Sequence, residues 1–440
     1  KANPDKEGAV NKGLICGKGK WGFDCSMLED KLEDPLVKED GNFREADYHE
    51  ALVLIAKRCQ SIAAKYGKDS VAVAVSDRYT NEEAYAVKMM AEAMGAKVLC
   101  MNNRESGLKA VTGLDASPNT IDELLSTNLI LKVGFEDAKS RVIALKIKQA
   151  EEAGAKVVTL CNGENSLGFL KEIAKAIIDS GKAKKVSGYD EFAAALDNVK
   201  VSDEAKAIAD QYLAAKKAMI VYQQNFLTVD GAKLVADIAM LSGHIGTPRD
   251  GILQVKAKNN SQGLIDMGIT AGSEALEGVK ALVVFGENAD IDTESLEFLA
   301  VCDTHMTELG AKANVVIPGT GFASVNGTFT NTERRMQLVQ AAIDEDILFS
   351  NWEVAAEIAH IFEVDFAWDG TDDISDEMCD TVDAYKYAQI GEVLGGVLKP
   401  SEDAALVAVA DGPVVDELPC TDSLMQVISM RLPKPANPTA

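Results

Sequence analysis

The residues best suited to bind a ligand lie in the segment 327–337, which reads Gly-Thr-Phe-Thr-Asn-Thr-Glu-Arg-Arg-Met-Gln. Thr328, Thr330 and Asn331 supply hydroxyl and amide groups, and Arg334 begins an arginine pair. An arginine pair can hold phosphate oxygens through paired hydrogen bonds, although it can equally bridge helices through carboxylates. The segment therefore predicts a polar loop that holds a phosphorylated ligand.

A second polar segment, 258–268, combines side-chain amides with a carboxylate and glycines. Asn260 and Gln262 carry the amides, Gly263 follows, and Asp266 carries the carboxylate. Together these groups can read the edge of a guanine or pterin ring, which presents several donors and acceptors in one plane. Because Asn and Gly also build plain turns, a purely structural role is the alternative.

Cys16 stands in a glycine-rich segment, with Lys18 two residues further on. Backbone amides can approach a sulfur cluster closely there, and a nearby lysine would tune the potential of that cluster. No other cysteine lies in residues 1–15, so a free loop cysteine is the alternative. The chain has eight cysteines, and they are too scattered to indicate a disulfide framework or a metal site made from local CxxC pairs.

Short β-branched runs alternate with helical patterns and predict the elements that position these residues. Strands are predicted at 71–75, 129–133, 156–160, 218–222, 281–285 and 314–318. Near-continuous apolar strands separated by helices are typical of parallel sheets covered on both faces. The predicted class is α/β, with two doubly wound, largely parallel-sheet domains and an irregular N-terminal segment.

The helix predicted at 81–94 begins after the capping residue Thr80 and stops at Gly95. Doubly wound sheets bind ligands beyond the carboxyl ends of their strands. Gly286, Glu287 and Asn288 directly follow the strand predicted at 281–285. We therefore expect these three residues at the ligand-binding edge of a sheet.

Composition bounds the possible partners and compartment. The 440 residues, 47% of them hydrophobic, suffice for two or three domains. The formal charge of −25 repels nucleic acid and anionic membrane surfaces, so we expect neither as a direct partner. No apolar run reaches the roughly 20 residues needed to span a bilayer, and the first residues lack the apolar core of a signal peptide, which favours a cytoplasmic protein.

From about residue 10 to residue 365 the motifs resemble, in the same order, those of the molybdopterin-dinucleotide oxidoreductases. The resemblance implies that Cys16 is one iron ligand of a [4Fe-4S] cluster whose other ligands lie outside this segment, with Lys18 between cluster and pterin. It also implies cofactor-binding roles for Asn260, Gln262, Gly263, Asp266, Gly286, Glu287, Asn288, Thr328, Thr330, Asn331 and Arg334.

The sequence departs from that family where active members hold their metal. A cysteine or selenocysteine follows the second strand in those enzymes, whereas residues 101–108 here contain neither cysteine nor histidine. Cys100, just before this stretch, is kept as a candidate ligand. Residues 131–137 and 158–163 replace the family's Gly-Ser-Asn and Asp-Pro-Arg elements, and acidic side chains in the first of them would repel phosphates.

The resemblance implies a division of the chain into four parts. These are a remnant of an N-terminal [4Fe-4S] domain (1–48), a discontinuous α/β domain (49–100 with 281–395), an inserted α/β domain (101–280) and an irregular tail (396–440). Independently of the resemblance, the acidic composition from about Trp368 and the proline-rich end favour a tail that lies on a partner or in solvent.

The departures favour a cofactor-depleted member of the family, without a catalytic site of its own and without bound molybdopterin guanine dinucleotide. It would serve as an iron–sulfur scaffold module in a soluble NAD(P)-linked electron-transfer complex, electron-bifurcating complexes included, with flavin and iron–sulfur subunits and a ferredoxin-like carrier as partners. The rival is a catalytic formate dehydrogenase-like subunit that retains a molybdenum or tungsten bis-pterin guanine dinucleotide. A third candidate is a nucleotide sensor that keeps one dinucleotide half-site.

Overall fold

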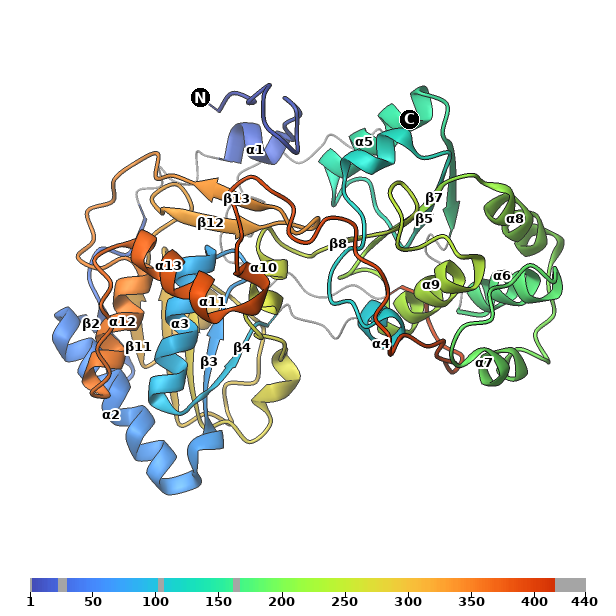
Figure 1. Ribbon diagram of the computed structural model, residues 1–440. Helices are drawn as coiled ribbons and strands as arrows, with labels where there is room; N and C mark the ends of the chain where they lie inside the picture. Colours follow the sequence, from blue (N-terminus) through green and yellow to red (C-terminus); the bar gives the residue numbers. More distant parts are fainter. Residues whose placement is uncertain (1, 23–29, 102–106, 161–166, 416–440) are drawn as a thin grey trace, which may run out of the picture.

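The computed structural model describes residues 2–22, 30–101, 107–160 and 167–415, apart from the side chain of Lys18. The chain forms two lobes, each built around a largely parallel sheet (Figure 1). We call them the seven-strand lobe and the four-strand lobe. This mixed α/β architecture with parallel sheets confirms the predicted fold class at that level.

The sheet of the seven-strand lobe has the order β2 (Asn42–Glu45), β1 (Leu36–Glu39), β11 (Val315–Pro318), β10 (Phe298–Asp303), β9 (Ala281–Phe285), β3 (Val71–Val75), β4 (Lys97–Leu99). From β11 to β4 every neighbouring pair is parallel, whereas β1 is antiparallel to both β11 and β2. The helices of this lobe are α2 (Tyr48–Tyr66), α3 (Asn81–Met94), α10 (Ser261–Asp266), α11 (Glu308–Lys312), α12 (Asn351–Ile361) and α13 (Thr371–Thr381), and a hairpin of β12 (Gly327–Thr330) and β13 (Met336–Val339) lies beside them.

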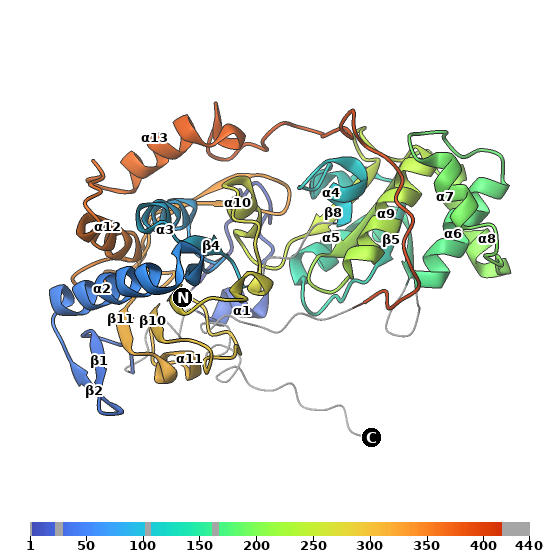
Figure 2. The ribbon, with the colours of Figure 1, turned by 90° about the horizontal axis from the view of Figure 1, so that it is seen from below.

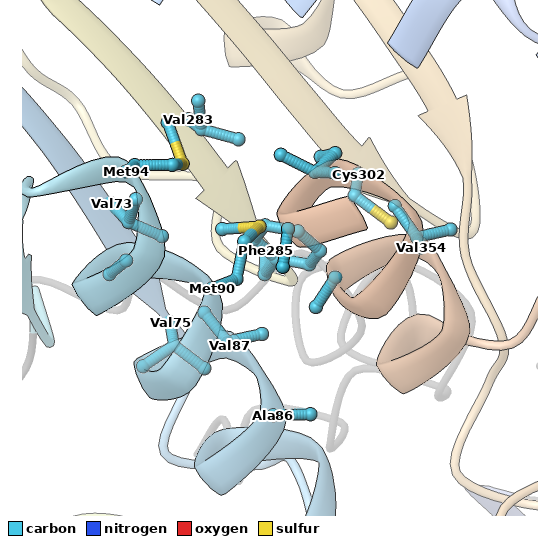
Figure 3. Packing of buried hydrophobic residues seen from close by; sticks show 14 of the residues in the cluster. Val73, Val75, Ala86, Val87, Met90, Met94, Val283, Phe285, Cys302 and Val354 are labelled. Carbon is cyan, nitrogen blue, oxygen red and sulfur yellow. The ribbon is translucent and has the colours of Figure 1, made fainter. Parts of the chain in front are cut away.

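Both faces of this sheet are covered, as near-continuous apolar strands require. Val73 and Val75 face a cluster completed by α2, α3, α12 and α13, part of which Figure 3 shows. Ala72 and Ala74 face the opposite cluster, which α11 completes. Alternate residues of β3 thus anchor two separate cores, and the strand is fully buried.

The sheet of the four-strand lobe is entirely parallel, in the order β6 (Lys156–Leu160), β5 (Leu129–Val133), β7 (Ala218–Gln223), β8 (Gly251–Val255). Its helices are α4 (Gly107–Thr112), α5 (Arg141–Glu152), α6 (Leu167–Asp179), α7 (Tyr189–Ala195), α8 (Asp203–Ala214) and α9 (Val229–Ser242). Leu131 faces the cluster made with α6 and α9, and Ile130 faces the cluster made with α5. Within the described ranges, no helix combines the length and the apolar character that crossing a bilayer requires.

The predicted strands agree closely with the observed ones. Four coincide in both bounds, β7 extends one residue further, and β11 begins one residue later. No strand was predicted at β4, β8 or β10, and a loop was predicted where β12 and β13 pair. In the described part of residues 1–48, which were expected to be largely irregular, β1 and β2 form a hairpin through Asp40 and Gly41, whose φ values of 48° and 84° suit a tight two-residue turn.

Residues 396–415, which we call the strap, form no helix or extended strand but lie across the four-strand lobe (Figure 2). Ala405 N donates to Val111 O at 2.9 Å, and Val407 N donates to Asp237 Oδ1 at 3.0 Å. Leu406 and Val414 are buried in the same core as α6 and α9. The described part of the expected tail therefore packs on the four-strand lobe of its own chain.

The start of α3 supports a first prediction. Thr80 Oγ1 accepts from Glu83 N at 3.1 Å, and Thr80 N donates to Glu83 Oε2 at 2.8 Å, which completes a capping box. Thr80→Ala should lower the free energy of unfolding by about 1 kcal/mol because the first turn loses its side-chain cap. Urea unfolding measures this loss. Thr80→Ser, which keeps the hydroxyl, should stay close to the parent, and an equal loss in both variants would show that the methyl group matters instead.

Candidate functional site

Three buried side chains meet at the carboxyl edge of the seven-strand sheet. Asp77 follows β3, Cys100 follows β4 and Glu287 follows β9, and one ligand atom of each lies within 4.8 Å of the other two. Cys100 Sγ is 3.9 Å from Glu287 Oε1, and Met101 N donates to Glu287 Oε2 at 3.2 Å. Because parallel strands end at the same edge, segments some 200 residues apart along the chain supply this cluster.

The charge state of this edge follows from its burial. Burial raises the pKa of Glu287 well above its usual range, and the nearby carboxylate of Asp77 raises it further. A thiol with two carboxylates suits a metal cation better than a phosphate. This edge alone therefore does not fit the phosphates of a dinucleotide.

The predicted residues Gly286 and Asn288 shape the loop at this edge. Gly286 has a φ of 70°, and a Cβ added there would lie 2.4 Å from Tyr79 Cε1, so both backbone conformation and space require glycine. Asn288 Oδ1 accepts from Leu309 N at 3.0 Å. The side-chain carbonyl of Asn288 thus connects the loop after β9 to α11 through a hydrogen bond.

The two polar segments singled out in the sequence come together around Asn260. Asn260 Nδ2 donates to Tyr79 O at 2.9 Å, and Asn260 Oδ1 accepts from Thr330 N at 2.8 Å. A Cβ on Gly263 would lie 2.3 Å from Asn260 Oδ1, so the close packing of α10 depends on glycine. The structure therefore joins the segments 258–268 and 327–337, as the prediction of one shared site requires.

The hydroxyls of Thr328 and Thr330 are occupied inside the protein. Thr328 Oγ1 donates to Glu82 Oε1 at 2.8 Å, and Thr330 Oγ1 lies 2.7 Å from the hydroxyl of Tyr385. Asn81 Nδ2 donates to both threonine hydroxyls, at 3.0 and 3.1 Å. Both threonines are buried, so they organise the base of the site and do not face outward.

Gln262 differs from these residues because half of its amide has no partner. Gln262 Nε2 donates to Asp266 Oδ1 at 2.8 Å and to Asp115 O at 3.3 Å. Gln262 is only 1% exposed, and its Oε1 is buried without a hydrogen bond. Asn259 Oδ1 is likewise buried without a hydrogen bond. A buried acceptor without a donor is costly, so these two oxygens mark where a ligand N–H group or an ordered water belongs.

Two buried charged groups accompany Gln262. Burial raises the pKa of Asp266 to about 6 and lowers the pKa of Lys256 to about 8. Lys256 was missed in the sequence, although a lysine that directly follows an apolar run at the end of a strand was a usable signal. Between these two pH values both groups are ionised, and the charge of the site changes on either side of that window.

Arg334 does not point into an open phosphate site. Arg334 is 4% exposed, and its guanidinium donates to backbone carbonyls, with Nε 3.0 Å from Ser117 O and Nη2 2.6 Å from Gly396 O. Nη1 donates to Leu394 O, and burial lowers the pKa of Arg334 to about 10. Most of its donors are therefore already used within the protein.

Asn331 closes the turn of the β12–β13 hairpin. Its Oδ1 accepts from Glu333 N and from Arg335 N, both at 3.0 Å. Its Nδ2 donates to Gln337 Oε1 at 2.9 Å. Both ends of the Asn331 side chain are thus engaged in the hairpin itself.

Cys16 lies apart from these groups. It immediately precedes α1 (Gly17–Trp21), is half-buried, and its Sγ accepts from Gly19 N at 3.4 Å. In the part of the chain that the structure describes, it makes no hydrogen bond to another predicted ligand residue. The side chain of Lys18 lies outside the described residues, as do 102–106 of the predicted metal segment and 161–163 of the eroded Asp-Pro-Arg element.

A family model described as "Molybdopterin oxidoreductase" matches residues 31–359, which is most of the chain. The chain belongs to the molybdopterin oxidoreductase family. The resemblance inferred from the motifs is therefore confirmed.

Among its relatives, this family member is similar to the F420-dependent formate dehydrogenase 2 subunit alpha of Methanococcus maripaludis, with 28% identity over 87% of this chain and 70% of that protein. It is 25% identical to formate dehydrogenase H of Escherichia coli, over 91% of this chain and 70% of that protein. Against another curated relative, from Bacillus subtilis, the chain spans 48% of the length. The solved structure of acetylene hydratase from Pelobacter acetylenicus has the same fold, with a TM-score of 0.68, 14% identity and coverage of 89% of this chain and 71% of that one.

The sequence left open a cofactor-depleted scaffold module and a formate dehydrogenase-like subunit. The comparisons support a formate dehydrogenase-like molybdopterin oxidoreductase, which was the rival reading. They do not show a degenerate cofactor site. One of these relatives is itself named as a subunit, which agrees with the expectation that the chain works within a larger assembly.

Proposed function

We propose that this chain binds a molybdopterin dinucleotide as the cofactor-binding part of a formate dehydrogenase-like oxidoreductase subunit. The observation that carries the proposal is the pair of buried acceptors, Gln262 Oε1 and Asn259 Oδ1, which have no donor within the described protein. A guanine or pterin ring presents N–H groups along one edge and would satisfy such acceptors. Around α10 the residues therefore fit the group.

The proposal gives the other predicted residues distinct roles. Asn260, Thr328 and Thr330 connect the two binding loops through hydrogen bonds. Cys100, at the carboxyl edge of the seven-strand sheet, would supply a sulfur ligand to the metal. When bound, the group would supply two-electron redox chemistry at molybdenum or tungsten. Cys16 and Lys18 would belong to an N-terminal iron–sulfur segment that passes electrons to flavin and iron–sulfur subunits and a ferredoxin-like carrier in an NAD(P)-linked assembly.

Metal and pterin analysis of the full chain, purified without oxygen from a host that makes the cofactor, tests this proposal. We expect molybdenum or tungsten together with a pterin released on denaturation. Gln262→Leu should reduce the retained pterin about tenfold or more, since the ring would lose a buried hydrogen bond. Gln211→Leu is the matched control, because Gln211 Oε1 on α8 is also buried without a partner but lies away from the site. Equal retention in both variants would contradict the role of Gln262.

A second candidate, the iron–sulfur scaffold without pterin, is favoured by one observation. Residues 101–108 contain no cysteine or histidine to hold the metal. In that case the preparation would contain iron but neither pterin nor molybdenum nor tungsten, and Cys16→Ser would lower its iron content. Guanine nucleotide without metal would indicate the sensor instead. Loss of metal but not of pterin in Cys100→Ser would assign the metal to Cys100.

A further inference from the structure

The turn between β12 and β13 lies against the four-strand lobe, toward which the hairpin points in Figure 1. Thr332 Oγ1 accepts from Lys256 N at 2.7 Å. Glu333 Oε2 accepts from Ile121 N at 2.7 Å. Thr332 and Glu333 of the seven-strand lobe thus accept hydrogen bonds from two separate segments of the four-strand lobe.

Arg334 adds a third segment and reaches the strap. Its Nε donates to Ser117 O in the four-strand lobe, and its Nη2 donates to Gly396 O where the strap begins. Its own carbonyl accepts from Leu394 N at 2.9 Å. A planar guanidinium can serve carbonyls on several sides at once, whereas an ammonium group cannot reproduce this geometry.

The backbone of Arg334 has an uncommon conformation. Its φ is 64°, in the left-handed region that disfavours residues with a Cβ, and it lies in the turn that joins β12 to β13. Glu333 is 1% exposed and Arg334 is 4% exposed, so both charged groups lie within the contact between the lobes. Charged groups are rarely buried unless their hydrogen-bonding capacity is used, and here backbone groups from both lobes use it.

The candidate ligand-binding residues share this contact. Gln262 Nε2 donates to Asp115 O, two residues before the carbonyl that Arg334 binds. Asp266 lies close enough to Arg334 for each to affect the ionisation of the other. The segment 115–117 of the four-strand lobe therefore contacts both α10 and the β12–β13 turn.

We propose that residues 332–334 form a latch that fixes the two lobes and the strap relative to one another, with Arg334 as its central positioning residue. On this assignment the arginine pair predicted to bind phosphate instead acts through the protein backbone. The proposal rests on contacts within the chain and does not depend on whether a pterin is bound.

Hydrogen exchange of single amides in the full chain, as purified, tests the latch. Arg334→Gln should accelerate exchange at the Ile121, Lys256 and Leu394 amides about tenfold or more, because these are the donors that the latch holds. Amides of β3 and β7, inside the two lobes, should keep their parent rates. The matched control is Arg44→Gln, since Arg44 on β2 pairs with Glu39 and Glu50 within its own lobe and not with a latch residue.

Two results would overturn the proposal. One is exchange at the three latch amides no faster in Arg334→Gln than in Arg44→Gln. The other is equal acceleration in β3 and β7, which would indicate general destabilisation. If Arg334→Gln does not fold, Thr332→Val replaces it, because this change removes only the acceptor of the Lys256 amide. A latch that opens as a unit predicts faster exchange at Ile121 and Leu394 as well, whereas a change confined to Lys256 would refute it.

Discussion

The stability advantage of Asp237→Asn over the parent chain is expected to grow by about 2–3 kcal/mol between pH 6 and pH 8. Asp237 lies in the middle of α9 with no exposed surface. Its Oδ1 accepts from Val407 N of the strap, and its Oδ2 is buried without a hydrogen bond. Burial raises the pKa of Asp237 to about 8, although Lys233 nearby opposes the change.

The sign follows from proton binding. The folded chain keeps the Asp237 proton up to about pH 8, whereas the unfolded chain releases it near pH 4. The parent therefore has its full stability at low pH and loses it progressively as the pH rises toward 8, by about 1.4 kcal/mol per unit. Asparagine cannot ionise, and its side-chain oxygen can still accept from Val407 N, so this pH dependence should disappear.

Urea unfolding at intervals from pH 6 to pH 9 measures this difference. Asp230→Asn provides a control on the same helix, because Asp230 is accessible and pairs with Lys233 at 2.9 Å. That control should show no advantage that increases with pH. A gap between Asp237→Asn and the parent that stays constant over the whole range would show that Asp237 is not held in its neutral form.

Phe285→Ala is expected to lower the free energy of unfolding by about 3–5 kcal/mol. Phe285 ends β9, which lies between β10 and β3, and its side chain has no exposed surface. Figure 3 shows it among Met90, Val87 and Val354, on the face of the sheet that α3 and α12 cover. Removing the ring leaves a cavity that strands paired on both sides cannot easily close.

The same substitution should disturb the sheet edge, because Phe285 directly precedes the loop that carries Glu287. Ser76 N donates to Phe285 O at 2.9 Å, so a hydrogen bond connects the end of β9 to the loop after β3. Phe285→Leu, which refills much of the cavity, should cost clearly less, and chemical denaturation of both variants measures the difference. Nearly equal small losses would mean that the core relaxes around the site.

The sequence alone determined the layered α/β scaffold. Apolar runs of strand length predicted most of the parallel strands, and Thr80 and Gly95 marked the two ends of α3. Hydrophobic period, helix capping and a left-handed stop are local signals that a sequence shows directly. The order of the motifs also determined the family. The same local signals failed at the β12–β13 hairpin, whose strands are only four residues long each and too short to show a clear alternation.

Only the tertiary structure decided what the polar residues do. Arg334 and Gln262 look equally suited to a ligand in the sequence, yet carbonyls from the other lobe occupy the guanidinium, and one amide oxygen of Gln262 has no partner. The grouping of Asp77, Cys100 and Glu287 likewise required three strands to end at one edge. A side chain's type fixes which hydrogen bonds it can make, but its partners come from distant segments, so packing alone determines which donors and acceptors remain for a ligand.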